Sequence, residues 1–302
     1  MTLTAIFFIA ISAFAHALWN LLGKREMPTA SFFLVANTLG CLCLAPVLFF
    51  NARAVLAMPG SAWAFLLLTG FFQALYYASL AGAYRAAQLS IAYPIVRSAS
   101  VLIVALANVA LGRGRQLSSL ALAGMVLVAG GILFLPLERF LDFRVKQYFS
   151  KSTLFAFAAA LGTAGYSLTD DHALRLIRPI LDPVSTHTQT ILLYSLFEGL
   201  STSLWLLIFV ASWKENPSGL VHFQGKKLGR AVLTGIAIYF AYTLVLLAMG
   251  FARNVSYVVA FRQLSIPIGV ALGVLALKEP LHEPKIAGVL SVTAGLVLVA
   301  MG

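Results

Sequence analysis

The chain has 302 residues, of which 61% are hydrophobic and 10% are charged. Soluble domains average about 45–50% apolar and about 25% charged residues, so this composition excludes a soluble enzyme and a disordered, fibrous or disulfide-stapled protein. A transmembrane helix needs about 20 apolar residues, and ten such helices would use about 200 residues. The composition therefore predicts an all-α polytopic membrane protein.

Basic residues outnumber acidic ones by 21 to 10, which gives a formal net charge of +11. They stand mainly in short segments between apolar runs, where Lys and Arg orient membrane spans and meet anionic lipid headgroups. We therefore expect membrane lipids, and no nucleic acid, as partners of the basic surface. Cys41 and Cys43 lie within one apolar run and cannot form a metal site by themselves, so we expect neither a metal nor a cofactor.

Ten apolar runs follow one another along the chain. They cover residues 2–22, 31–50, 62–82, 91–111, 118–137, 153–173, 188–211, 229–250, 256–277 and 285–301. The break after the fifth run reads ERFLDFRVKQYFSK, and its alternating aromatic and basic residues are typical of a segment at the membrane interface. We therefore expect a first five-helix repeat over 1–138, an interfacial linker over 139–152 and a second five-helix repeat over 153–302.

Three patterns recur in the same order in the two halves. A tyrosine followed six residues later by an alanine occurs in the third and eighth runs. IAYPIVRS, with Tyr93 and Arg97, corresponds to VSYVVAFRQ, with Tyr257 and Arg262. AGMVLVAGGILFL in the fifth run corresponds to AGVLSVTAGLVLVA in the tenth. Because five is odd, the second copy enters the membrane from the opposite side, which predicts two inverted repeats around a central cavity.

AHALWNLLGK in the first run, GYSLTDDHAL in the sixth and the paired fourth–fifth and ninth–tenth runs resemble the EamA family of the drug/metabolite transporter superfamily. The resemblance covers essentially the whole chain. It implies a ten-helix transporter with a cavity lined by spans one, three, four, six, eight and nine. The family often has an acidic residue after the fourth and ninth spans; Glu279 fits, whereas GRGRQ places Arg113 and Arg115 after the fourth.

Arg97 and Arg262 are the strongest candidates for substrate binding. Each lies about six residues into its span, about 9 Å along a helix axis. A charge at membrane depth costs about 2.5–3.5 kcal/mol on insertion scales unless it meets water or a partner. A guanidinium binds carboxylate or phosphate through two parallel hydrogen bonds, so we expect an anion-binding pair. The alternative is that either arginine snorkels to the surface or pairs with Asp170, Asp171 or Glu198.

His16, Trp19 and Asn20 share one stretch of the first span, and His16 and Asn20 lie on one helix face. Together they offer an imidazole, a ring for stacking and an amide to a substrate. Tyr166 in the sixth span lies at comparable depth. The alternative is that Trp19 anchors the span at the interface and that His16 is a packing residue.

Four tyrosines occupy repeated positions and are candidates for the cavity wall, although packing is the alternative for each. They are Tyr77, Tyr93, Tyr242 and Tyr257.

Three acidic residues are candidates for proton coupling, because a carboxyl group removed from water can take up and release a proton. Asp170 and Asp171 stand near the end of the sixth span, and Glu198 lies well inside the seventh. The alternatives are a solvated helix end for the two aspartates and a structural ion pair or hydrogen bond for Glu198.

No H-E-x-x-H, G-x-S-x-G or Walker A pattern occurs, so we expect neither an enzyme nor direct use of ATP. The pattern favours a secondary transporter in the cell (inner) membrane, a monomer or weak dimer. Its substrate would be a small anionic or zwitterionic metabolite that crosses by alternating access, with protons as candidate partners. The resemblance to the EamA family favours export and is compatible with an amino acid or an organophosphonate-like compound. The alternatives are a translocase of a lipid-linked sugar or phospholipid headgroup, and a membrane receptor or assembly factor that transports nothing.

Overall fold

The computed structural model describes residues 2–23, 29–86, 89–135, 137–144, 151–212, 225–278 and 280–302. Within these ranges the side chains of residues 18–23, 84–95, 98, 151–153, 226, 273, 276 and 277 lie outside the description. All regular structure in the described ranges is helical, which confirms the expected all-α class.

The long helices are α1 (Leu3–Gly23), α2 (Ala30–Leu42), α5 (Gly60–Ala86), α6 (Leu89–Asn108), α7 (Ser119–Phe134), α8 (Lys151–Leu181), α9 (His187–Ser212), α11 (Lys226–Met249), α13 (Ser265–Leu277) and α14 (Glu283–Met301). The shorter elements are α3 (Val47–Phe50), α4 (Ala52–Ala57), α12 (Val255–Phe261) and the turns η1 (Val109–Arg113), η2 (Gly114–Gln116), η3 (Phe140–Asp142) and η5 (Arg262–Leu264).

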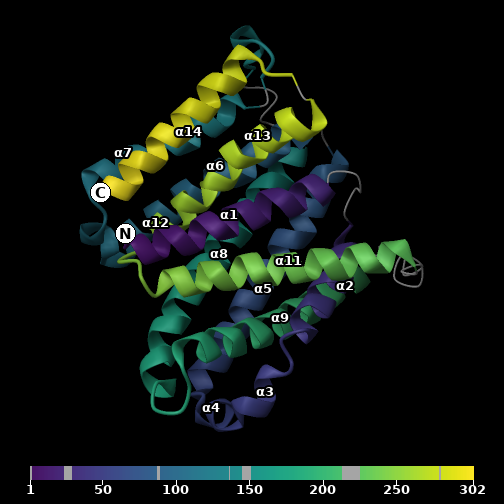
Figure 1. The fold of residues 1–302 in the computed structure, drawn as a ribbon, viewed down its shortest axis with the longest axis vertical. Helices are drawn as coiled ribbons and strands as arrows, with labels where there is room; N and C mark the ends of the chain where they lie inside the picture. Colours follow the sequence, from purple (N-terminus) through teal and green to yellow (C-terminus); the bar gives the residue numbers. More distant parts are fainter. Residues whose placement is uncertain are drawn as a thin grey trace.

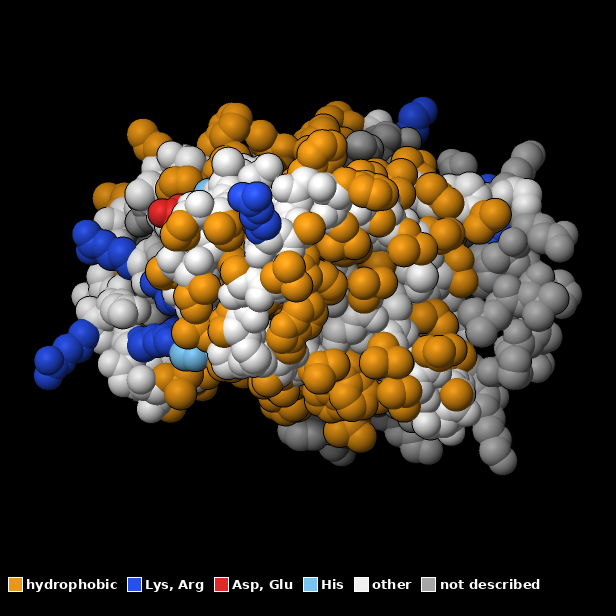
Figure 2. All heavy atoms as spheres, turned by 90° about the horizontal axis from the view of Figure 1, so that it is seen from below, with side chains coloured by type: hydrophobic (Ala, Val, Ile, Leu, Met, Phe, Trp, Pro, Cys, Tyr) orange, Lys and Arg blue, Asp and Glu red, His pale blue; other side chains and the backbone are white. Residues whose placement is uncertain are grey.

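Six of the described segments are long and apolar enough to cross a membrane. They are Ala30–Phe50, Gly60–Ala83, His187–Ser212, Lys227–Met249, Val255–Leu272 and Glu283–Met301. Large apolar side chains are also exposed in mid-helix, as at Leu204 and Leu207 of α9, which a water-facing surface would disfavour. Figure 2 shows hydrophobic side chains across the middle of one face and most Lys and Arg side chains toward its ends. These features indicate a polytopic membrane protein.

The most extensive helix contacts join the two halves of the chain. From the first half, α5 packs against α8 and α9, α2 against α9 and α11, and α6 against α8. α1 packs against α11 and α13, and α7 packs along α14. In Figure 1, α1 and α11 cross the middle of the molecule, α7 and α14 form one edge, and both termini lie at the same end. The core is therefore built between the halves rather than within each.

Helices α7 and α14 touch through their backbones. A Cβ on Gly124 would lie 2.6 Å from the carbonyl oxygen of Gly295, and a Cβ on Gly295 would lie 2.7 Å from the carbonyl oxygen of Gly124. Gly131 and Gly288 show the same reciprocal relation, at 2.9 and 2.7 Å. The two helices therefore run antiparallel, and glycine is required at these crossings because any side chain would push the backbones apart.

Two of the expected continuous spans are interrupted. The run over 31–50 contains a turn between α2 and α3, just where Pro46 cannot donate a backbone hydrogen bond. The run over 256–277 is divided by the turn η5, one turn before Pro267, which leaves the helical ladder incomplete there. The second interruption matters for the site, because Arg262 begins η5.

Candidate functional site

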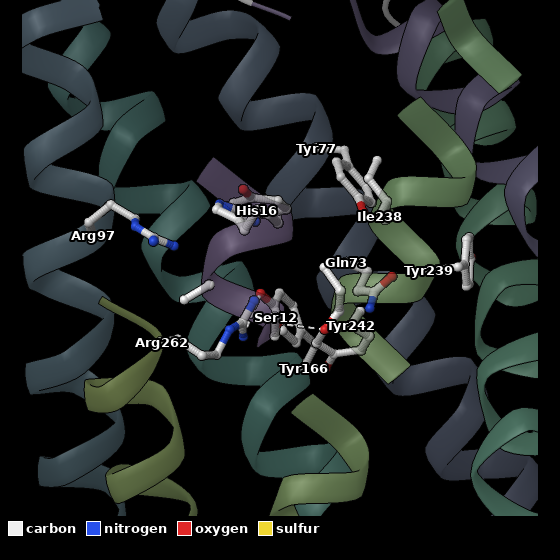
Figure 3. A pocket seen from close by; sticks show the side chains of 13 residues that line it. Ser12, His16, Gln73, Tyr77, Arg97, Tyr166, Ile238, Tyr239, Tyr242 and Arg262 are labelled. Carbon is white, nitrogen blue, oxygen red and sulfur yellow. Dashed lines mark hydrogen bonds between the residues drawn. The ribbon is translucent and has the colours of Figure 1, made fainter. Parts of the chain in front are cut away.

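A cavity lies at the centre of the described helices (Figure 3). Its polar lining comes from Ser12, His16, Gln73, Tyr76, Tyr77, Arg97, Tyr166, Tyr239, Tyr242 and Arg262. These residues belong to α1, α5, α6, α8, α11 and η5, which are the first, third, fourth, sixth, eighth and ninth apolar runs. The space open to the centres of water molecules is about 50 Å³. This is room for about three to five waters, so the cavity is narrow.

Arg262 is held by the faces of two tyrosine rings. Its Cζ lies 6.0 Å from the ring centroid of Tyr166 and 5.4 Å from that of Tyr242, which is within cation–π range. Nη1 also donates a long hydrogen bond of 3.4 Å to the Tyr166 hydroxyl. In the described part of the chain the guanidinium forms no ion pair with a carboxylate. Its charge is therefore stabilised by aromatic faces, while most of its N–H donors remain for a ligand.

Arg97 reaches the same cavity from α6. Its Nη2 donates to Ser265 Oγ, and Ser265 Oγ donates to the backbone carbonyl of Arg262 at 3.0 Å. Figure 3 shows Arg97, Arg262 and His16 around one side of the cavity, with both guanidinium groups pointing inward. The structure thus brings together the two arginines and the histidine that the sequence singled out. Their arrangement can offer several N–H donors to one anionic group.

Tyrosines form a connected part of the cavity wall. Tyr76 and Tyr77 lie 5.1 Å apart between ring centroids, and Tyr76 meets Tyr166 edge-to-face at 6.1 Å. Tyr166 in turn meets Tyr242 edge-to-face at 5.5 Å. Such rings provide apolar faces and hydroxyl donors, so an uncharged aromatic surface continues along the cavity wall from the Arg262 guanidinium.

Sequence reasoning missed four polar lining residues, Ser12, Gln73, Tyr76 and Tyr239. Gln73 carried a usable signal, because an amide in the middle of an apolar run needs a hydrogen-bond partner. Tyr76 and Tyr239 carried none, since neither recurs at an equivalent position of the other half.

Asp170 is fully buried directly behind the cavity wall. Its Oδ1 accepts hydrogen bonds from Thr69 Oγ1 at 2.5 Å and from the Tyr194 hydroxyl at 2.8 Å, and its Oδ2 accepts one from the Tyr242 hydroxyl. The side chain is therefore a hydrogen-bonded core group rather than the solvated helix end considered as its alternative.

Glu198 is buried beside it. Its Oε1 accepts a hydrogen bond from the Gln73 amide, whose own oxygen accepts one of 3.1 Å from the Thr202 hydroxyl. In the described ranges Glu198 forms no ion pair, so of its two predicted structural partners the hydrogen bond is the one observed.

Asp171 points away from the cavity, although it is adjacent to Asp170 in sequence. It forms ion pairs with Arg113 Nη1 at 3.1 Å and with Arg175 Nε at 3.0 Å. Arg175 Nη2 also donates to the carbonyl oxygen of Arg253 at 3.3 Å. Arg113, the arginine that follows the fourth run, thus binds α8. The network joins the α6–α7 connection, α8 and the α11–α12 connection.

Buried amides reinforce the same end of the molecule. Asn254 Nδ2 donates to Asn108 Oδ1 and to Gln116 Oε1, both at 3.1 Å, and Asn108 Nδ2 donates to Ser256 Oγ at 3.1 Å. These bonds again join the α6–α7 connection to the start of α12. We call the Asp171 ion pairs and these amide bonds the sealed end.

Tyr257 lies at the sealed end and not among the cavity-lining residues. Its hydroxyl is 3.3 Å from the backbone nitrogen of Ser118 and 3.4 Å from the carbonyl oxygen of Gln116. Spacing explains the difference from the expectation: Tyr257 precedes Arg262 by five residues, which places the two on different helix faces. The side chains of Trp19, Asn20 and Tyr93, and residue Glu279, lie outside the described part of the chain.

No protein-family model matches the chain, and no curated protein matches it. Among 27 matching chains of solved structures, one has a TM-score of 0.69 and 18% identity, and the alignment covers 98% of this chain and 95% of that chain. Its title, "Crystal structure of protein", names no activity. At this identity the likeness shows the fold alone.

Proposed function

We propose that the chain is a secondary transporter that moves a small anionic or zwitterionic metabolite across the cytoplasmic (inner) membrane by alternating access. The observation that carries the proposal is the convergence of Arg97 and Arg262, from opposite halves, on one central cavity. Two partly buried cations at one cavity are expensive in a membrane protein unless they serve a substrate. The tyrosine wall would hold the uncharged part of the metabolite.

The packing also supports ten spans in two inverted repeats, as in the EamA family. If α1, α2, α5, α6 and α7 correspond to α8, α9, α11, α12–α13 and α14, each of the most extensive contacts between halves has a counterpart or is its own counterpart. The α5–α8 contact matches α11–α1, the α5–α9 contact matches α11–α2, and α6–α8 matches α13–α1. The reciprocal glycine contacts of α7 and α14 fit the same two-fold relation. Such symmetry supplies two equivalent packings that can alternate.

In an alternating-access cycle, the bonds of the sealed end would block the exit of substrate on that side. The Arg113–Asp171 ion pair and the Asn254–Asn108 bond each join the first half of the chain to the second. In this proposal they close one end of the cavity. For a substrate to leave by that end, these bonds must break, and a matching set must form elsewhere. This is the behaviour of a gate made of small bistable contacts.

Thermal stabilisation of the purified protein tests the substrate class. The probes are methanesulfonate, methylphosphonate, glycine and tetramethylammonium, and the variants are Arg97→Ala and Arg262→Ala. Arg115→Ala is the matched control, because Arg115 is exposed and lies outside the cavity. A ligand at 100 times its Kd stabilises the folded state by about 2.7 kcal/mol.

We expect an anionic or zwitterionic probe to raise the unfolding temperature of the parent and of Arg115→Ala, and neither cavity variant to respond. A stabilising probe is then loaded into proteoliposomes, and counterflow of its labelled form reports transport. Stabilisation by tetramethylammonium alone, or an unchanged response of both cavity variants, would contradict the anion site. Binding without counterflow would support a receptor instead.

A further inference from the structure

Two carboxyl groups lie side by side behind the cavity wall. Asp170 on α8 is 0% exposed and Glu198 on α9 is 1% exposed. Thr69 and Gln73, one turn apart on α5, bind the two carboxyl groups in that order. On α9, Tyr194 binds Asp170 one turn before Glu198. The two carboxyl groups are therefore separated by about one helical turn, about 5.4 Å.

The hydrogen bonds around Asp170 fit an anion. Three hydroxyl donors, from Thr69, Tyr194 and Tyr242, surround its two oxygens. An ionised carboxyl group only accepts hydrogen bonds and has about four acceptor positions, so all three donors are satisfied without a proton on the aspartate.

Glu198 has the opposite surroundings. Its Oε1 accepts one hydrogen bond, from Gln73, and its buried Oε2 has no hydrogen-bond partner among the described residues. A buried charged oxygen without a donor is costly, and the neighbouring Asp170 anion would add repulsion. A neutral carboxyl group avoids both costs. The geometry therefore assigns one proton to the pair, on Glu198.

Two side chains contact both the cavity and the pair of carboxyl groups. Tyr242 and Gln73 line the cavity, and each also binds one of the two carboxyl groups. Arg262 lies over the Tyr242 ring and acts electrostatically on both carboxyl groups. A change in the charge of the two carboxyl groups therefore changes the electrostatic potential at Arg262, where an anion would bind.

We propose that Asp170 and Glu198 form one proton-binding site that is linked to anion binding at Arg262, so that a proton and an anion cross together. On release, the O–H bond of Glu198 breaks, its electron pair stays on the carboxylate oxygen, and the proton passes to water in the cavity. The second negative charge then competes for Arg262 and weakens its hold on the anion. The linkage rests on the proposed function, whereas the proton-binding site does not.

Other titratable groups face the pair from each packed element. They are Tyr77 of α5, Tyr194 of α9, Tyr239 and Tyr242 of α11, and Arg262 of η5. Tyrosines are ordinarily neutral and arginine is ordinarily charged near pH 7. His16 of α1 lines the same cavity and is the other group there that can change charge near neutral pH. Glu198→Gln leaves His16 in place, so the part of a pH dependence that this variant removes belongs to the two carboxyl groups.

Infrared spectroscopy of the ligand-free protein tests the proton-binding site. We expect a C=O stretching band of a protonated carboxyl group near neutral pH that is lost in Glu198→Gln and kept in Asp182→Asn, an exposed matched control. Gln73→Leu keeps the carboxyl group but removes its hydrogen-bond donor, so the band should move to higher frequency. A parent without the band, or a band unchanged in both Glu198→Gln and Gln73→Leu, would overturn the proposal.

Methanesulfonate tests the linkage, because this probe stays anionic over the whole pH range used. We expect its Kd for the parent to rise with pH, by up to about tenfold per pH unit if one proton is linked to binding. In Glu198→Gln the Kd should vary by less than about twofold over the same range. A pH-independent parent Kd would overturn the linkage. If methanesulfonate does not bind at all, the proposed function fails, and the infrared result still decides the proton-binding site.

Discussion

The guanidinium of Arg262 lies over the ring of Tyr242, with 5.4 Å between Cζ and the ring centroid. The hydroxyl of the same tyrosine donates a hydrogen bond to the buried Asp170. One side chain therefore touches both the cation of the cavity and the anion behind its wall. The contributions of its ring and of its hydroxyl group can be measured separately by substitution.

Replacing Tyr242 by Phe should destabilise the ligand-free protein. The ring remains for Arg262, but Asp170 loses one of its three hydroxyl donors, and a hydrogen bond to a charged group is worth about 1.5–3 kcal/mol. Tyr166→Phe is the matched control, since it removes only a long bond of 3.4 Å and should cost less than about 1 kcal/mol. Thermal unfolding followed by intrinsic fluorescence compares the two, and equal losses would contradict the network.

Substitution of Gly124 by Ala should weaken the contact of α7 with α14. The new Cβ would meet the backbone oxygen of Gly295 at 2.6 Å, and such overpacking costs about 1–3 kcal/mol. Gly130→Ala on the same helix meets no atom within 4 Å and should leave the protein unchanged or about 1 kcal/mol more stable. The midpoint of thermal aggregation reports both, and the contact is refuted when Gly124→Ala is as stable as Gly130→Ala.

Loss of the Asp171 ion pairs should open the sealed end more often. In a background with Cys41→Ser and Cys43→Ser, the cavity-lining Ser12→Cys provides a reporter. Adding Asp171→Asn should raise the rate at which a membrane-impermeant thiol reagent labels the reporter from the sealed side. A change of about tenfold corresponds to about 1.4 kcal/mol between closed and open states.

The control for this experiment is Arg115→Ala, which alters an exposed arginine of the same connection and should leave labelling unchanged. Labelling that is equally slow with and without Asp171→Asn would mean that the ion pairs do not close the cavity.

The sequence predicts functional positions best where a charged or polar residue stands inside an apolar span, because placing it there costs free energy. Arg97, Arg262 and His16 stood out because apolar residues would have been cheaper there, and the structure brings them to one cavity. The three-dimensional partners of these residues were hidden, because contacts between helices join positions far apart in the chain. Arg97 and Ser265 are 168 residues apart and share a hydrogen bond.

Adjacent residues show the limit most clearly. Asp170 and Asp171 differ by about 100° around the α8 axis, so one faces the cavity wall and the other faces Arg113. The sequence alone predicted proton coupling for both without distinguishing them. Tyr257 shows the same limit, since a one-residue change in spacing relative to Tyr93–Arg97 placed it on another face.

The interleaving of the two halves has a consequence for biosynthesis. Because α5, α2 and α6 find their main neighbours on α8, α9 and α11, the first half emerges from the ribosome with these faces uncovered. Until the second half is inserted, these helix faces contact lipid instead of their native partners. We expect the two halves, made as separate polypeptides, to stabilise each other, and either half made alone to be less stable than the whole chain.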